Sequence, residues 1–360
     1  MKTKVAILFG GRSAEHEISI ISAQNVFQAL DKNRFEVALI KIDKQGSLLP
    51  VGGDYFLLEE QKKAITQGEE LFLSPSTKAE KLVTKTGKTF PKVDVVFPVL
   101  HGPFGEDGTI QGLLSLANIA FVGCPILASA IAMDKAMTKQ LALINGIPTA
   151  AFVILKKFEK DSLSFEDLEK ELGLPFFVKP VTLGSSVGVS KVTNKAQYKK
   201  ALDLAFSYDE KIIIETFIKG REVEVGILGI GAEVKASVVG EVKTDHDFYS
   251  YVAKYTETEG LRMEIPASIP EDTAEKVREL ALRAFKAIDG VGMARCDFFL
   301  KEDGTILLNE INPIPGFTQF SMYPKLWEAT GIPYGKLIEK LIELAITRHE
   351  AINKLKTTYD

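Results

Sequence analysis

The residues best suited to chemistry are acidic and amide side chains on either side of a tight turn near the C-terminus. The dipeptide Asp303-Gly304 separates two apolar runs, a pattern typical of a two-residue β-turn between antiparallel strands. Counting back along both strands from such a turn places Asp297 opposite Glu310, and Arg295 opposite Asn312. Because side chains alternate between the two faces of a strand, all four residues are expected to share one face.

This face has the ligand types of a magnesium site. The opposed carboxylates of Asp297 and Glu310 repel each other, and a divalent cation between them removes the conflict. Asn312 supplies a neutral third oxygen, and hard oxygen ligands suit Mg²⁺, which keeps open positions for phosphate oxygens. Cys296 is expected to point the other way, into a core. The alternative is a solvated sheet face on which the acids and Arg295 form an ion-pair network.

A second group of residues has the composition of a phosphate-binding site. One predicted strand ends near Lys179, and residues 184–188 follow with the sequence Gly-Ser-Ser-Val-Gly. Small residues let backbone N–H groups approach a phosphate closely, and a lysine adds positive charge. Lys135 lies in an apolar helical stretch, and Glu215 and Glu222 stand at strand ends, where carboxylates can bind ribose hydroxyls. The alternatives are a plain connector, a surface lysine and solvated strand ends.

Other nucleotide and catalytic motifs are absent from the sequence. Gly87-Lys88-Thr89 resembles the end of a P-loop, but Leu82 occupies the position of the required upstream glycine, which favours an exposed turn. Gly10-Gly11 lacks the G-x-G-x-x-G spacing of a dinucleotide site. The chain has neither the paired-cysteine or H-x-x-x-H spacing of a zinc site nor the G-x-S-x-G elbow of a serine hydrolase.

The elements that position these residues alternate between strand and helix in the first third of the chain. Apolar runs predict strands at residues 5–9, 37–42, 93–100 and 120–122. Residues 46–92 are predicted to be irregular, and helical periodicity predicts helices at residues 18–30, 110–116 and 127–144. Such alternation predicts a parallel sheet covered on both faces, with ligand sites at the carboxyl ends of its strands. The turns at Gly10-Gly11 and His101-Gly102 lie at two of those ends.

From about residue 150 the strands become shorter and the turns more frequent. Strands are predicted at residues 176–180, 211–215, 222–228 and 234–242. A loose charged tail is expected at the C-terminus, after helices predicted at residues 196–205, 273–288 and 334–345. We therefore expect an α/β domain at residues 1–130, a central α+β domain at residues 131–220 and a C-terminal domain at residues 221–360.

Length and charge exclude several classes of protein. A chain of 360 residues is too long for one compact core, and its 48 acidic against 44 basic side chains give a formal net charge of −4. That balance argues against a general nucleic-acid binder. No apolar run approaches the ~20 residues of a membrane helix, and the N-terminus offers no secretory signal, so we expect a cytoplasmic protein. Cys124 and Cys296 sit among apolar residues and are expected to be buried free thiols.

Together these segments resemble the ATP-grasp superfamily and, within it, the D-alanine–D-alanine ligases. The resemblance covers nearly the whole chain apart from residues 46–92. It rests on blocks in the family's order at residues 10–19, 101–108, 133–135, 178–188, 251–255, 295–297 and 309–318. It implies a mixed α/β and α+β architecture, in which an N-terminal parallel α/β (pre-ATP-grasp) domain is followed by a two-part ATP-grasp fold.

The resemblance also implies the reaction and the nucleotide site. ATP would phosphorylate one D-alanine to an acylphosphate, which a second D-alanine attacks, giving D-Ala-D-Ala, ADP and phosphate for peptidoglycan precursor synthesis. Two Mg²⁺ ions, for which Mn²⁺ can substitute, would bind Asp297, Glu310 and Asn312. Lysines would hold the phosphates, one of them on a loop near residues 243–258 that closes over the site. By position, the implied ATP-binding residues are Lys135, Lys179, Ser186, Glu215, Phe217, Ile218, Glu222 and Lys254.

Further residues are implied to handle D-alanine. Glu15 would hold the ammonium group of the first D-alanine, and His101 would lie near its carboxylate. Ser185 and Tyr255 would form a hydrogen-bonded triad with Glu15. Arg295 and the Gly316 N–H would form an oxyanion hole, and Ser321 would bind the carboxylate of the second D-alanine. The family also implies a homodimer, with no nucleic-acid or membrane partner.

Three departures from the family pattern bear on the second substrate. Pro313 and Gln319 stand where threonine and serine are common, and Val252 stands where glutamate is common. An alternative reading is therefore a ligase that uses D-lactate as second substrate, against which Tyr255 argues because D-lactate-using relatives tend to lack it. A further alternative, of another class, is an inactive ATP-grasp fold that only binds nucleotide.

Overall fold

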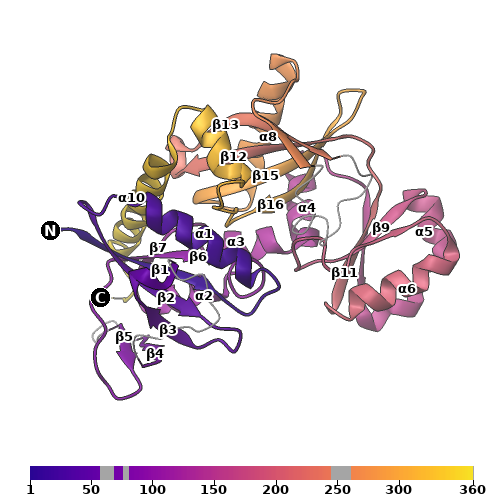
Figure 1. The fold of residues 1–360 in the computed structure, drawn as a ribbon. Helices are drawn as coiled ribbons and strands as arrows, with labels where there is room; N and C mark the ends of the chain where they lie inside the picture. The colour runs from indigo at the N-terminus through magenta and orange to yellow at the C-terminus, as the bar shows by residue number, and fades with distance from the viewer. Residues whose placement is uncertain (57–68, 76–80, 245–260, 360) are drawn as a thin grey trace.

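The described residues of the computed structural model, 1–56, 69–75, 81–244 and 261–359, form three β-sheets with helices packed on them. Figure 1 shows the N-terminal sheet at the left next to the C-terminal helix α10 (Tyr334–Asn353), the third sheet above the centre and the second sheet at the right. Lys254, Tyr255 and most of the predicted closing loop lie outside the described residues. Within the described ranges, no helix combines the length and the apolar character that crossing a membrane requires.

The first sheet has a parallel centre built from buried apolar strands. Its strand order is β5-β4-β3-β2-β1-β6-β7, and its parallel strands are β1 (Thr3–Gly10), β2 (Phe35–Ile42), β6 (Val95–Val99) and β7 (Ala120–Phe121). Consecutive residues of β1, such as Ile7 and Leu8, are both buried, because the sheet is covered on both faces. The predicted strands and their parallel arrangement are confirmed.

The stretch predicted to be irregular extends this sheet. It contains β3 (Leu48–Val51), β4 (Leu71–Leu73), β5 (Leu82–Thr84) and the 3-10 helix η1 (Gly53–Phe56). The prediction for residues 46–92 is therefore wrong in these places. The strands pair antiparallel and have only three or four residues each, too few to give a periodic signal in the sequence. The turn at Gly87 is confirmed, since its N–H donates to Thr84 O at 2.9 Å.

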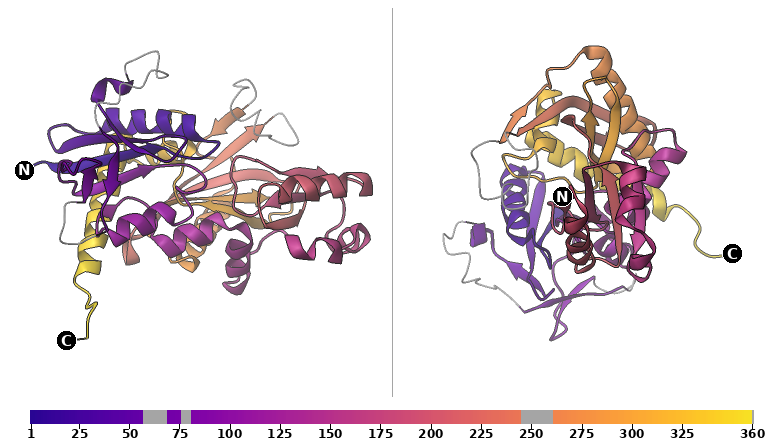
Figure 2. Two further views of the ribbon diagram at one scale, coloured as in Figure 1. Left: turned by 90° about the horizontal axis from the view of Figure 1, so that it is seen from below. Right: turned by 90° about the vertical axis from the view of Figure 1, so that its right-hand side faces the viewer.

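Three helices accompany this sheet: α1 (His16–Ala29), α2 (Thr109–Leu116) and α10. Leu337 and Ile338 of α10 share one buried cluster with Ile20 and Val26 of α1, so segments from the two ends of the chain form a common core. The left view of Figure 2 shows α10 beside the N-terminal sheet. The expected loose tail is wrong over residues 346–353, because α10 continues to Asn353.

The single long helix predicted at residues 127–144 is instead two helices, α3 (Ile126–Met133) and α4 (Lys135–Ile144). Between them Asp134 has an extended backbone, with φ −84° and ψ 98°, and its side chain accepts a hydrogen bond from Met137 N at 3.0 Å. Asp134 is thus the N-cap of α4, and it also forms an ion pair with Lys211. This break makes Lys135 the first residue of α4.

The second sheet has the strand order β10-β9-β11-β8. Its strands are β8 (Phe152–Lys156), β9 (Phe176–Pro180), β10 (Ser190–Val192) and β11 (Lys211–Thr216). The predicted strand at residues 176–180 is confirmed to the residue. Helices α5 (Phe165–Leu172) and α6 (Lys195–Phe206), with the 3-10 helix η2 (Lys157–Ser162), complete this part of the chain, and side chains of α5 and α6 pack with Phe176 in one core.

The third sheet has the strand order β14-β13-β12-β15-β16. Its strands are β12 (Arg221–Gly229), β13 (Lys235–Thr244), β14 (Leu261–Glu264), β15 (Gly292–Leu300) and β16 (Ile306–Asn312), with the 3-10 helix η3 (Gly231–Glu233). Helix α8 (Glu271–Ala287) packs on one face through Val277, Ala281 and Phe285. Helix α9 (Met322–Ala329), which the sequence did not indicate, packs against β12 and β13. Cys124 and Cys296 are buried free thiols, as predicted.

The turn between β15 and β16 differs from the prediction. The N–H of Gly304 donates to Lys301 O at 3.0 Å, and the N–H of Lys301 donates to Thr305 O at 2.9 Å. Residues 302–304 therefore form a three-residue turn, with Gly304 in the left-handed region at φ +83°. The predicted two-residue turn is wrong.

A β-bulge compensates for the longer turn. Phe298 pairs with Leu308, whereas Asp297 pairs with Glu310, so Asn309 is the extra residue of β16. Beyond the bulge the predicted pairing holds, since Asp297 faces Glu310. The extra turn residue and the extra strand residue cancel each other, and the acidic pair lies where the sequence predicted it.

Candidate active site

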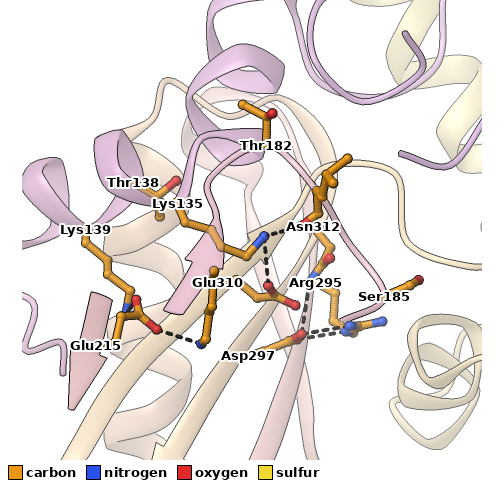
Figure 3. Close-up of polar contacts among 12 residues, drawn as sticks. Lys135, Thr138, Lys139, Thr182, Ser185, Glu215, Arg295, Asp297, Glu310 and Asn312 are labelled. Atoms are coloured by element: carbon orange, nitrogen blue, oxygen red, sulfur yellow. Dashed lines mark hydrogen bonds and ion pairs between the residues drawn. The ribbon is translucent and has the colours of Figure 1, made fainter. Parts of the chain in front are cut away.

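The polar side chains predicted to form a site on the β15–β16 hairpin lie on one face of the third sheet. Arg295 pairs with Asn312 in the register, and the Asn312 Nδ2 donates to Asp297 Oδ2 at 2.9 Å. Phe298 points to the opposite face and is buried. Figure 3 shows Arg295, Asp297, Glu310 and Asn312 converging from the two strands. The predicted one-sided placement of these four side chains is confirmed.

Arg295 compensates part of the negative charge on this face. Its guanidinium donates to both oxygens of Asp297 at 2.7 Å and lies 2.8 Å from Glu224 Oε2. Glu224 pairs with Asp297 across β12 and β15, so three carboxylates, with Glu310, form a row across the sheet. Burial opposes the charged form of Arg295, but Asp297 and Glu224 outweigh it and raise the Arg295 pKa well above its usual value. The ion-pair network considered as an alternative to metal is therefore present.

The donor set nevertheless fits a hard cation. Among the described residues, no three His, Cys, Asp or Glu side chains are grouped so as to hold a metal. A Mg²⁺ ion at the Asp297–Glu310 pair would thus need Asn312 as its neutral oxygen ligand, which is the set predicted from the sequence. The side chain of Glu310 is only partly buried, at 29% exposure, and remains accessible to a ligand.

Lys135 connects this hairpin to the glycine-serine loop. From the first turn of α4, its Nζ donates to Leu183 O at 2.7 Å and lies 3.6 Å from Glu310 Oε2. The surface-lysine alternative is wrong, because only 14% of this side chain is exposed. The position of Lys135 depends on the helix break, since Asp134 caps α4 immediately before it.

A buried group of three charges lies beside Lys135. Glu215 Oε2 accepts from Lys179 Nζ at 2.6 Å, and Glu215 Oε1 lies 3.0 Å from Lys139 Nζ. Burial alone would raise the Glu215 pKa, but the two ammonium groups outweigh it and lower the pKa to about 2. Lys179 was predicted at this site, whereas Lys139 was missed. Its spacing of one helical turn from Lys135 was the available signal.

The glycine-serine loop has strained geometry. Ser185 and Ser186 both have left-handed backbones, with φ +53° and +59°. Consecutive non-glycine residues in this region are uncommon, and such strain concentrates at functional sites. Ser185 Oγ donates to Glu15 Oε1 at 2.6 Å, so the loop reaches the residue that immediately precedes α1. Two members of the predicted triad are therefore in contact, and Tyr255, its third member, lies outside the described residues.

Glu15 lies where the carboxyl ends of β1 and β6 meet. At the end of β1, Gly10 has φ +93°, and a Cβ there would stand 2.3 Å from Ile42 O, so the turn requires glycine. A Cβ on Gly102, which follows β6, would stand 3.0 Å from Glu15 Oε2. His101 is buried, with Nε2 3.2 Å from Ser22 Oγ, and burial lowers its pKa despite the nearby charge of Glu15.

Glu106 belongs to the same loop and was given no role in the sequence. Its Oε2 accepts from Gly102 N at 2.6 Å and its Oε1 from Ile314 N at 3.3 Å. The carboxyl group thus joins the loop after β6 to the segment after β16. Burial, together with the charge of Glu15, raises the Glu106 pKa to about 8. The position of Glu106 within the block at residues 101–108 was the only available signal.

Gly316 and Ser321 are adjacent after β16. Ser321 Oγ lies 2.9 Å from both Thr318 N and Thr318 Oγ1. A Cβ on Gly316 would stand 2.6 Å from Ser321 Oγ, so the small residue allows this close approach. The two residues predicted for the oxyanion hole and the second carboxylate site therefore lie side by side. Gln319, one of the departures from the family pattern, is exposed next to them.

The residues predicted to line the adenosine pocket lie in β11, in the segment after it and at the start of β12. Phe217 is half-buried, its ring 6.0 Å from that of Phe177, and Lys191 Nζ lies 4.5 Å above it. Ile218 is also half-buried, and Glu222 is exposed at the start of β12. Both side-chain oxygens of Glu215 are engaged by lysines, and its predicted part in nucleotide binding stays a prediction.

The protein has a parallel α/β unit followed along the chain by two sheets, with a cluster of lysines and carboxylates between these sheets. This is the arrangement of an ATP-grasp enzyme, and the predicted fold class is confirmed. Comparison with known proteins identifies the family within that class. The family described as D-ala D-ala ligase N-terminus matches residues 4–124, and that described as D-ala D-ala ligase C-terminus matches residues 141–343. The chain belongs to the D-alanine–D-alanine ligase family.

Individual relatives match over their full length. The chain is 46% identical to D-alanine–D-alanine ligase A of Escherichia coli K12 over 362 aligned positions, covering 99% of each chain. It is 45% identical to the D-alanine–D-alanine ligase of Shouchella clausii, covering 99% of this chain and 98% of the relative. Among solved structures, the D-alanine–D-alanine ligase of Coxiella burnetii matches with a TM-score of 0.85 and 35% identity over 98% of each chain. The VanG D-Ala:D-Ser ligase of Enterococcus faecalis matches with a TM-score of 0.87 and 34% identity, over 96% of this chain and 100% of its own.

Proposed function

We propose that the protein joins two D-alanine molecules at the expense of ATP, releasing ADP, phosphate and D-Ala-D-Ala for peptidoglycan precursor synthesis. The observation that carries the proposal is the contact between Ser185 and Glu15. It brings Glu15, whose carboxylate would bind the ammonium group of the first D-alanine, to the loop that would cover the ATP phosphates, within the architecture of a D-alanine–D-alanine ligase family member.

The first step would be phosphoryl transfer to a carboxylate. One carboxylate oxygen of the first D-alanine attacks the γ-phosphorus of ATP, the bond to the β–γ bridging oxygen breaks, and ADP leaves. Catalysis of this step rests on positioning and charge neutralisation. Lys135 and Lys179 are suited to hold the α- and β-phosphates beneath residues 184–188, with Ser186 on that loop. Phe217, Ile218 and Glu222 would bind the adenosine, and Lys254, carried over from the family, would reach the γ-phosphate.

Asp297, Glu310 and Asn312 would hold two Mg²⁺ ions, for which Mn²⁺ can substitute. When bound, these cations would neutralise phosphate charge and orient the γ-phosphoryl group. The residues fit that role because their oxygens share one accessible face of the sheet. The protein's own part is to keep this face ordered, which Arg295 does by holding Asp297 through two hydrogen bonds.

The second step would be attack of the amine of the second D-alanine on the acylphosphate carbonyl. The C–N bond forms, the amine loses a proton, and phosphate leaves as the tetrahedral intermediate collapses. Arg295 and the Gly316 N–H would stabilise the negative oxygen, and one such donor contributes about 3 kcal/mol. Glu15 and His101 would hold the first D-alanine, Ser321 would bind the carboxylate of the second, and Tyr255 would complete the triad with Ser185.

The direct test is phosphate release from Mg²⁺-ATP with and without D-alanine, combined with chromatography of the product. We expect phosphate release to depend on D-alanine and to match D-Ala-D-Ala formation mole for mole. Nucleotide binding without D-alanine-dependent phosphate release would instead support the inactive nucleotide-binding module.

The second substrate is proposed to be D-alanine rather than D-lactate. The same assay with D-alanine, D-lactate and D-serine as competing second substrates tests this across a range of pH. D-serine belongs in the panel because one structural relative is a D-Ala:D-Ser ligase. Preferential formation of the D-lactate ester at neutral pH would contradict the proposal.

The remaining proposals concern organisation. We infer domains at residues 1–130, 131–220 and 221–360, a homodimer, and a cytoplasmic location. The location is supported by the two free, buried thiols, which suit a reducing compartment. Limited proteolysis tests the boundaries, light scattering tests the dimer, and cell fractionation tests the location.

A further inference from the structure

Lys139 is a buried cation to which neither the sequence nor the proposed mechanism assigns a role. It lies on α4 one turn after Lys135, and only 1% of its side chain is exposed. Figure 3 shows it reaching Glu215 from the same helix that carries Lys135 toward Glu310. Desolvating an ammonium group is costly unless it is paired, and burial lowers the Lys139 pKa despite the charge of Glu215. A buried ammonium group that is costly to desolvate is therefore a candidate for a functional role.

The three charges around Glu215 do not balance. Lys139 lies 3.0 Å from one oxygen of Glu215 and Lys179 lies 2.6 Å from the other, so two cations share one carboxylate. The three residues come from different elements: Lys139 from α4, Lys179 from β9 and Glu215 from β11. These three side chains carry a net positive charge when all are ionised, and the nearby charge of Glu310 favours the charged form of both lysines. Without Lys139, Lys179 would be the remaining cation of this group paired with Glu215.

We propose that Lys139 is a positioning residue for nucleotide binding, which holds Glu215 so that the positive charge of Lys179 stays available to an ATP phosphate. The inference deepens the proposed function and rests on it, because it needs Lys179 to face the nucleotide. Lys139 acts through Glu215 and is not itself assigned a contact with ATP. A plain structural tie between α4 and β11 would use the same ion pair but would leave nucleotide affinity unchanged in the folded protein.

The first test compares Lys139→Met, which keeps an unbranched side chain one atom shorter and removes its charge, with Lys139→Arg, which keeps the charge. MgATP binding is measured directly by calorimetry, and steady-state kinetics give separate KM values for ATP and D-alanine. We expect Lys139→Met to weaken MgATP binding by roughly tenfold to a hundredfold, the range for a lost interaction with a buried charge, and to leave the KM for D-alanine unchanged. Lys139→Arg should retain most of the affinity.

The matched control is Thr138→Val on the same helix. Thr138 is equally inaccessible and donates to Ile131 O at 2.7 Å, so its replacement removes a buried polar contact without changing the charge near Glu215. Thermal unfolding of each variant reports the structural cost separately. A folded Lys139→Met protein that binds MgATP as wild type does would overturn the proposal, whatever its melting temperature.

A double variant keeps the proposal testable if Lys139→Met does not fold. Lys139→Met with Glu215→Gln removes one positive and one negative charge. The net charge of the three positions 139, 179 and 215 is then the same as in wild type. We expect this double variant to bind MgATP more tightly than the sum of the affinity losses of the two single variants predicts. Strictly additive effects, or in the absence of a folded single variant a double variant that binds no MgATP, would contradict the inference.

The two levels of proposal fail differently. If the wild-type protein binds MgATP and forms dipeptide while Lys139→Met behaves like wild type, only the role of Lys139 is refuted. If wild type binds no MgATP, the proposed function fails and with it the role of Lys139.

Discussion

At the residue scale, the contact between Ser185 and Glu15 links two regions that are far apart in the sequence. Ser185→Ala removes the 2.6 Å hydrogen bond to the Glu15 carboxylate. Because a hydrogen bond to a charged group contributes about 1.5–3 kcal/mol, we expect the KM for the first D-alanine to rise roughly tenfold or more. Steady-state kinetics with D-alanine and ATP varied separately give the measurement, and the KM for ATP should change little.

The control for this change is Ser207→Ala, because the Ser207 hydroxyl donates only to Leu204 O on the exposed end of α6. That variant should keep both KM values. Equal effects of the two substitutions would show that Ser185 has no particular role in binding D-alanine.

Glu310 is the second residue that can be tested alone. Glu310→Gln keeps the shape of the side chain and removes one carboxylate from the proposed magnesium ligands. Changes outside the ligand shell already cost roughly 10–100-fold in metal affinity or activity, so we expect turnover to fall by at least about 100-fold. Glu302→Gln in the exposed turn of the same hairpin is the control and should keep full activity.

Manganese binding separates a metal defect from general damage. Titration monitored by Mn²⁺ electron paramagnetic resonance in the presence of ATP should show weaker binding in Glu310→Gln than in wild type. Wild-type turnover and Mn²⁺ affinity in this variant would refute the assignment of Glu310 as a ligand.

At the element scale, the break between α3 and α4 fixes the direction of Lys135. Asp134→Ala removes both the cap on Met137 N and the ion pair with Lys211, whereas Asp134→Asn keeps a capping oxygen. Loss of an N-cap costs about 1 kcal/mol, so urea unfolding should show Asp134→Ala to be less stable than Asp134→Asn by about that amount. ATP affinity should follow the same order, since Lys135 is the next residue. Equal stability of the two variants would exclude the cap as the cause of the break.

The elements also show what the sequence could and could not predict. Buried strands such as β9 were predicted to the residue, because a short apolar run between polar turns has few alternatives. The helix break was missed because residues 127–144 keep an apolar periodicity on both sides of Asp134, and a single capping side chain overrides it. The pairing of Asp297 with Glu310 was predicted correctly from an incorrect turn, since the bulge at Asn309 offset the extra turn residue.

The candidate site was predictable where a motif is local. The glycine-serine loop, Lys179 and the acidic hairpin are visible as short sequence patterns. Lys139 and Glu224 were not predicted, because each pairs with a residue on another element: Glu215 of β11 for Lys139 and Arg295 of β15 for Glu224. The spacing of Lys139 from Lys135 indicates a shared side of the helix, but nothing in the spacing indicates the partner that tertiary packing brings to it.

At the scale of the whole molecule, Glu106 joins the loop after β6 to the segment after β16, and this contact should be sensitive to pH. Its pKa is raised from the ordinary 4.5 to about 8, mainly by burial and then by the charge of Glu15. The folded protein therefore keeps this proton where the unfolded chain has lost it. The stabilisation is fully present below about pH 4.5 and is lost as the pH rises through about 8.

Urea unfolding at a series of pH values tests this link. As the pH rises from about 4.5 to 8, the contribution of Glu106 to the free energy of unfolding of wild type should decrease. Glu106→Gln lacks this contribution, so the difference in free energy of unfolding between the two proteins should vary with pH. Glu302→Gln, which removes an exposed carboxylate in a turn, should show the same dependence of the free energy of unfolding on pH as wild type. Parallel profiles for Glu106→Gln and wild type would show that this carboxyl group has an ordinary pKa.

A buried cation in α10, Arg348, contacts the N-terminal sheet directly. Arg348 donates to Gly123 O at 2.5 Å and to Phe121 O at 2.7 Å, and its guanidinium lies 4.3 Å above the Phe121 ring. Burial lowers the Arg348 pKa only to about 10, so the group is charged at neutral pH. Arg348→Leu would leave two buried carbonyl groups unpaired, at a cost of about 1–3 kcal/mol each.

Arg34→Leu is the comparison, because Arg34 also bonds α10, through Glu339 at 2.5 Å and Glu343 at 3.0 Å, but its side chain is 47% exposed. Ion pairs of an exposed arginine contribute at most about 1 kcal/mol, and Glu339 keeps Lys336 as a partner at 2.8 Å, so chemical unfolding should rank Arg348→Leu well below Arg34→Leu in stability. Equal losses would mean that α10 is held by apolar contacts alone. A larger loss for Arg348→Leu would show that the last turns of α10, which the sequence predicted as part of a loose tail, contribute to the stability of the N-terminal sheet.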